Sequence, residues 1–109
     1  MALNLPKVIA AYFDADNKGE ANVLSTYFAE NAIVKDEGNT YTGRNAIREW
    51  IANASTQYSY TVEPLSLSEE NGKIIVTSHL VGNFPGSPVD LRYFFKLRND
   101  EIAELEIIP

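Results

Sequence analysis

The fold is decided by residues 73–82, which read KIIVTSHLVG. Side chains of a strand alternate between its two faces. One face of this strand would carry Ile74, Val76, Ser78 and Leu80, and the other Ile75, Thr77, His79 and Val81. A strand that is apolar on both faces has to be covered on both sides. Helices of the same chain can cover one side, so we expect the other to form a homodimer interface, most simply a two-fold one.

The rest of the chain supplies both kinds of element. Residues 59–67, 89–97 and 102–108 alternate like further strands, and the Asn71-Gly72 pair favours a tight hairpin turn. These hairpins predict an antiparallel sheet. Before them, apolar residues recur at helical spacing over 5–16, 20–28 and 46–54, with a short strand at 32–36 and a turn at 37–39. Helices followed by strands predict an α+β fold, formed by a single domain over residues 1–109.

Composition narrows the classes of function. The net charge of −6 argues against a nucleic-acid partner and against an anionic membrane surface. One histidine and no cysteine leave almost nothing for a zinc site, so we expect no metal. The first four residues do not read as a signal peptide. With the absence of cysteine, this predicts a cytoplasmic protein.

Two motifs carry a resemblance to a known family. The segment Phe28–Asp36, FAENAIVKD, is similar to the one that enters the first strand of NTF2-like proteins. Tyr41–Trp50, YTGRNAIREW, is similar to the entry into their third helix. The chain therefore resembles the NTF2-like superfamily, and within it the SnoaL-like proteins and the ketosteroid isomerases. This resemblance implies a cone, also called cystatin-like, in which three N-terminal helices pack on a strongly curved sheet and enclose a pocket.

The resemblance to the isomerases implies two catalytic residues. Tyr12 matches the tyrosine that donates a hydrogen bond to the oxyanion, and Asp36 matches the aspartate that acts as general base. The isomerases also carry a protonated aspartate in the strand before the last one. The matching position here is Tyr93 or its neighbour Arg92, which departs from the pattern.

We also predict the residues that form the pocket wall around Tyr12. These ligand-binding positions are Phe28, Trp50, Val76, Leu80 and Tyr93. Alternatives remain for several of the predicted site residues. Asp36 could simply start a turn, while Tyr12 and Trp50 could be core residues. His79 could face the pocket, although its parity with Thr77 favours the dimer face.

Two hypotheses about function follow. In the first, the protein is an isomerase or cyclase that needs no cofactor and acts on a small hydrophobic carbonyl compound. In the second, it is a non-catalytic dimeric module that binds an apolar ligand or a partner. The fold supports both kinds of protein, and the absence of the protonated aspartate favours the second hypothesis.

Overall fold

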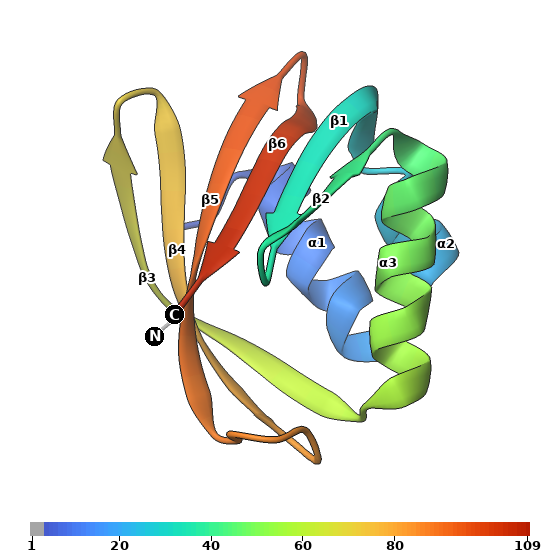
Figure 1. The fold of residues 1–109 in the computed structure, drawn as a ribbon. Helices are drawn as coiled ribbons and strands as arrows, with labels where there is room; N and C mark the ends of the chain where they lie inside the picture. Colours follow the sequence, from blue (N-terminus) through green and yellow to red (C-terminus); the bar gives the residue numbers. More distant parts are fainter. Residues whose placement is uncertain (1–3) are drawn as a thin grey trace.

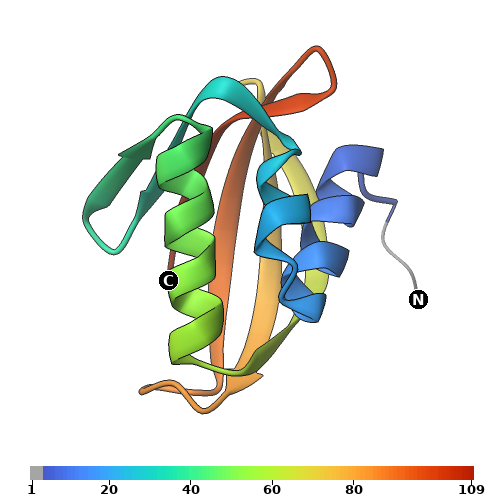
Figure 2. The ribbon, with the colours of Figure 1, turned by 90° about the vertical axis from the view of Figure 1, so that its right-hand side faces the viewer.

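The fold was analysed in a computed structural model. It describes residues 4–109 and their side chains, except the side chain of Ser55. The domain was expected to begin at residue 1, so its first three residues lie outside the described part of the chain. The same holds for most of the segment that was tested for a signal peptide. The helices and strands are α1 (Lys7–Lys18), α2 (Ala21–Ser25), β1 (Phe28–Asp36), β2 (Asn39–Thr42), α3 (Arg44–Gln57), β3 (Tyr60–Glu70), β4 (Lys73–Gly82), β5 (Val89–Arg98) and β6 (Glu101–Ile108). The helices lie together on one face of a curved sheet (Figures 1 and 2). This arrangement confirms the predicted α+β class.

The sheet has the strand order β2-β1-β6-β5-β4-β3. The hairpins from β3 to β6 are antiparallel as predicted, and Asn71 and Gly72 adopt the positive φ angles, 54° and 77°, that a tight hairpin turn requires. The prediction of a wholly antiparallel sheet is wrong for one pair, because β1 runs parallel to β6. The short strand β2 was also missed; it pairs with β1 across the turn that was expected at residues 37–39. The sheet is therefore mixed.

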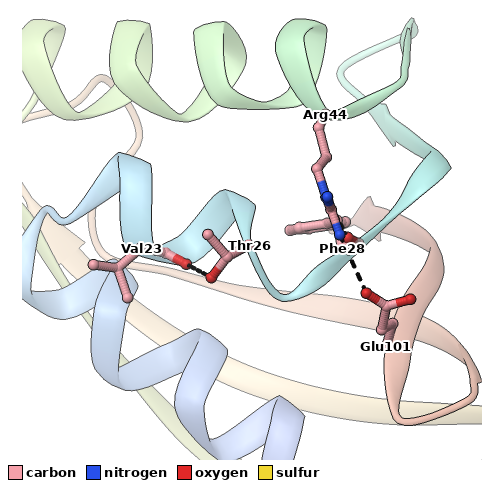
Figure 3. Close-up of polar contacts among 5 residues, drawn as sticks. All are labelled: Val23, Thr26, Phe28, Arg44 and Glu101. Carbon is pink, nitrogen blue, oxygen red and sulfur yellow. Dashed lines mark hydrogen bonds and ion pairs between the residues drawn. The ribbon is translucent and has the colours of Figure 1, made fainter.

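The second helix is shorter than predicted. It ends at Ser25 instead of continuing to Phe28, and Phe28 begins β1. Beyond the helix end, the Thr26 hydroxyl donates to the carbonyl of Val23 at 2.6 Å (Figure 3). The Phe28 carbonyl accepts a hydrogen bond from Arg44 Nε at 2.9 Å. The Thr26 hydroxyl thus satisfies a carbonyl of the last helical turn, and the Phe28 carbonyl finds its partner on α3, so the chain leaves the helix and enters the sheet.

Arg44 also ties the start of α3 to the start of β6. Its Nη2 lies 3.2 Å from Glu101 Oε2, while its Nε holds the first residue of β1 (Figure 3). One side chain thus connects a helix with two strands that are far apart in the sequence. This connection helps to place α3 over the end of the sheet that contains β1.

An aromatic cluster fills the space between α1 and the sheet. The Tyr12 and Phe13 rings pack edge-to-face against Tyr93 and Phe95, with ring centroids 5.1–6.3 Å apart. All four side chains are almost fully buried. Edge-to-face packing is the geometry that the charge distribution of aromatic rings favours. The cluster places Tyr93 and Phe95 on the helix-facing side of β5, as the alternation of residues 89–97 requires, and fixes Tyr12 and Tyr93 in position.

Candidate functional site

A cavity of about 420 Å³ opens between the helices and the concave face of the sheet. Its wall is aromatic and aliphatic, with a smaller number of acidic groups. The aromatic residues that line it are Tyr12, Trp50, Tyr58, Tyr60, Phe84 and Tyr93. The acidic residues are Asp16, Asp36 and Glu37. Within the described chain, no Lys, Arg or His lines this cavity.

The structure brings five of the seven predicted site residues to one cavity. They are Tyr12, Asp36, Trp50, Leu80 and Tyr93. Phe28 and Val76 do not line it, and both are fully buried in the core. Phe28 lies at the opposite end of β1 from Asp36, and Val76 lies four residues before Leu80 along β4. The alternation of side chains placed Val76 on the correct face of the sheet but could not say where along the strand the cavity begins, and Phe28 had been expected in a helix.

Tyr12 presents its hydroxyl group to the cavity. Its ring is 2% exposed, yet no hydrogen bond joins its hydroxyl to any described residue. Among the described residues, Ser78 Oγ is the one side-chain polar atom that is both sealed from solvent and without a partner. The Tyr12 hydroxyl therefore keeps accessible surface. Burial, and then the negative charge of Asp16, raise the pKa of Tyr12 well above 10, so the phenol stays protonated and can donate.

Tyr93 resembles Tyr12 in its burial, in the lack of a partner for its hydroxyl and in its raised pKa. It is 2% exposed, its hydroxyl has no hydrogen-bond partner in the described part of the chain, and it lines the same cavity. Burial, followed by the charges of Asp16 and Asp36, raises the pKa of Tyr93. The cavity thus contains two protonated phenols that are free to bind a ligand.

Asp36 ends β1 at the cavity wall and is held by Trp50. The indole Nε1 donates to Asp36 Oδ2 at 3.1 Å, and the Trp50 ring stacks on Tyr41 of β2 at 5.8 Å between centroids. Burial raises the pKa of Asp36, and the hydrogen bond from Trp50 opposes that rise. A higher pKa makes the carboxylate a stronger base. The missed strand β2 therefore supports the Trp50 ring that positions Asp36.

Asp16 is a site residue that the sequence analysis did not identify. The Tyr60 hydroxyl donates to Asp16 Oδ1 at 2.6 Å. Burial raises the pKa of Asp16 from 3.8 to about 6, and the hydrogen bond from Tyr60 limits the rise. The neighbouring Asn17 side chain exchanges two hydrogen bonds with the backbone of Val62, at 2.8 and 2.7 Å, and so fixes the end of α1 against β3. The available signal was a carboxylate on the apolar face of the helix.

His79 lies outside the cavity. Its Nδ1 is 2.6 Å from Asp90 Oδ1, and both side chains are on the outer face of the sheet. Leu80, the next residue along β4, lines the cavity, so His79 points the other way. The prediction that His79 shares a face with Thr77 and points away from the pocket is confirmed.

Comparison with known proteins agrees with this fold. The SnoaL-like domain family matches residues 9–105. A suspected polyketide cyclase from Sinorhizobium meliloti has a solved structure that superposes with a TM-score of 0.90, at 41% identity over 95% of both chains. None of the curated proteins compared with the chain matches it. The chain belongs to the SnoaL-like domain family and has the NTF2-like fold.

Two more distant structures show the same fold at lower identity. A ketosteroid isomerase-like protein from Catenulispora acidiphila, solved in complex with trimethylamine, has a TM-score of 0.86 at 21% identity, over 97% of this chain and 87% of that one. The epoxide hydrolase/cyclase-like enzyme SalBIII, which has a role in pyran ring formation in salinomycin, has a TM-score of 0.81 at 22% identity, over 94% and 87%. At this identity the likeness concerns the fold alone.

Proposed function

We propose that this protein is a small-molecule enzyme of the isomerase or cyclase type, which abstracts a proton next to a carbonyl group. Asp36 is the base and Tyr12 the oxyanion donor. The observation that carries the proposal is that both side chains line one apolar cavity. The 41% identity with a suspected polyketide cyclase supports a reaction of this kind.

The proposed step uses the two groups together. Asp36 Oδ2 accepts the Trp50 hydrogen bond, so Oδ1 is available to take the proton. The C–H bond breaks, its electron pair forms a carbon–carbon double bond, and the carbonyl oxygen becomes negatively charged. The Tyr12 hydroxyl donates to that oxygen. A general base contributes about 10²–10⁴-fold to the rate, and one oxyanion donor about 10²–10³-fold.

Hydrogen–deuterium exchange at an activated ketone tests the step without knowledge of the natural substrate. 2-Tetralone in D₂O loses its α-proton signals in the NMR spectrum when a base catalyses exchange. We expect the protein to accelerate this loss, and Asp36→Asn to reduce the acceleration at least about 100-fold. Glu30→Gln is the matched control, because Glu30 is an exposed carboxylate on the same strand. An Asp36→Asn variant that exchanges at the wild-type rate would rule out the proposed base.

The alternative is a non-catalytic dimer that uses the cavity for binding alone. It is favoured by one observation, that Tyr93 or Arg92 occupies the position where the isomerases carry a protonated aspartate. Under this alternative the protein leaves 2-tetralone exchange unchanged, and so does every variant of Asp36. The exchange experiment therefore separates the two functions.

A homodimer through the outer sheet face is proposed for either function. Val81 on that face is 47% exposed, and the Arg92 guanidinium lies over the Phe94 ring at 5.8 Å. Acidic and basic side chains mix on this face, as in the Lys96–Glu104 pair, so two copies related by a two-fold axis can match opposite charges.

Sedimentation velocity should show a dimer that Val81→Asp dissociates. Val23→Asp is the control, since Val23 is 41% exposed on α2, on the helical side. A wild-type monomer at every concentration would refute the dimer.

A further inference from the structure

The cavity holds a partly buried negative charge that the proposed reaction does not use. Asp16 lies on α1, one turn after Tyr12, and its side chain is half-buried at the cavity wall. The ion pairs among the described residues involve Lys18, Arg44, His79 and Lys96, and none of them reaches Asp16. Burying a carboxylate is costly unless an opposite charge compensates for it. Above the raised pKa of Asp16, a cationic ligand that enters the cavity would supply that charge.

Asp16 is arranged to bind such a ligand. Tyr60 occupies Oδ1, and no described residue donates a hydrogen bond to Oδ2. Tyr60 thus contacts Asp16 directly, and the Tyr12 and Tyr93 side chains line the same cavity as Asp16. The faces of aromatic rings attract cations, and this attraction strengthens where water is excluded. A carboxylate in a cavity whose wall is rich in tyrosine suits an organic ammonium group.

We infer that Asp16, with the surrounding tyrosine rings, binds the ammonium group of an amine-bearing substrate next to the Tyr12–Asp36 pair. The inference rests on the proposed function and specifies the substrate class as a carbonyl compound that carries a protonated amine. The two buried phenols without partners, Tyr12 and Tyr93, give such a ligand a place for its oxygen, since each can donate a hydrogen bond to it.

Three probes that share a branched end but differ in charge test the inference. Choline is the cation, 3,3-dimethylbutan-1-ol is its uncharged carbon isostere, and 3,3-dimethylbutanoate is an anion with the same branched end. The chain contains one tryptophan, Trp50, and it lines the cavity, so its fluorescence reports binding. We expect choline to bind about tenfold more tightly than the alcohol, and the anion to bind most weakly.

The role of Asp16 is tested by substitution and by pH. Asp16→Asn should remove most of the preference for choline over the alcohol. Asp14→Asn is the matched control, because it removes the same charge from an exposed position of α1 that is paired with Lys18. The site binds a cation in its ionised form, so affinity for choline is present above the Asp16 pKa of about 6 and is lost below it. Between about pH 7 and pH 5 the loss is about tenfold.

The loss of choline affinity between about pH 7 and pH 5 can be assigned to Asp16 once the other titratable groups of the cavity are considered. Tyr12, Tyr60 and Tyr93 have raised pKa values and stay protonated across this pH range. Asp36 is the other cavity aspartate with a raised pKa, so an Asp36→Asn variant reports how much of the pH effect belongs to Asp16. A titration that disappears in Asp16→Asn is the expected result, and one that disappears only in Asp36→Asn would overturn the assignment.

The outcomes separate this inference from the proposed reaction. Exchange of 2-tetralone with no preference for choline over the alcohol would overturn the ammonium site and leave the reaction standing. Tight binding of choline without any exchange would overturn the reaction and leave the site standing. Equal affinity for choline in wild-type and Asp16→Asn protein would also overturn the site.

Discussion

Replacing Asp16 by asparagine should increase the stability of the protein at neutral pH and have a much smaller favourable effect in acid. The pKa of Asp16 is raised from 3.8 to about 6 in the folded state, because the carboxyl group is buried without a cationic partner. The folded protein therefore holds this proton more tightly than the unfolded chain does. Stability falls as the pH rises from about 4 to about 6, and the cost is complete above the folded pKa.

The size of this effect follows from the two pKa values. The interval between 3.8 and about 6, at about 1.36 kcal/mol for each pH unit, corresponds to about 3 kcal/mol in total. About 2 kcal/mol of it falls between pH 4.5 and pH 7.5. Asparagine has nearly the same shape and retains an oxygen that can accept the Tyr60 hydrogen bond, but it does not titrate. The advantage of the variant over the wild type should therefore grow by about 2 kcal/mol across this range.

Urea denaturation followed by circular dichroism, at both pH values, measures the difference. Asp14→Asn serves as control, since it removes a charge of the same sign from an exposed position of the same helix. If the free-energy difference between Asp16→Asn and the wild type is the same at both pH values, the burial of an unpaired carboxylate is refuted. An advantage over the wild type that shrinks as the pH rises would contradict the sign of the argument.

Two further substitutions test the local geometry. Tyr60→Phe removes the hydroxyl that favours the ionised form of Asp16, so the pKa of Asp16 should rise above about 6 in a carboxyl-detected NMR titration; an unchanged pKa would show that the hydrogen bond contributes nothing. Gly82→Ala would place a Cβ 2.4 Å from the carbonyl oxygen of Ser59 and 2.6 Å from Tyr60 Cβ, and overpacking of this kind should lower the free energy of unfolding by about 2 kcal/mol or more. A variant as stable as the wild type in urea would contradict that close approach.

Much of the fold could be predicted because it depends on local patterns. Apolar residues recur with a period of about 3.6 in the first part of the chain and of 2 in the second part. These two periods predicted the helices and the long strands in their order. The positive φ of Gly19 at the end of α1, and the turn at Asn71 and Gly72, follow from the conformational freedom of these residues. The resemblance to the isomerases then pointed to Tyr12 and Asp36, and both line the cavity.

The parts that could not be predicted depend on contacts between distant residues. Nothing near β1 in the sequence indicates that it pairs with β6, because the partner lies about 70 residues further along the chain. The same limit applies to the end of the second helix, where Arg44 holds the Phe28 carbonyl. The local sequence pattern predicted a helix as far as Phe28, because it contains no information about this tertiary contact.

By itself, the sequence determined the α+β class and the residues of β4 that share a face, and its resemblance to a known family pointed to two polar residues of the cavity. Only the tertiary structure decided which of those inward residues reach the cavity, so that Leu80 lines it and Val76 is sealed in the core. It also decided that Asp16 meets Tyr60, 44 residues away, at 2.6 Å. The physical reason is that periodicity fixes the direction of a side chain, whereas burial, hydrogen bonding and pKa depend on what the folded chain places opposite it.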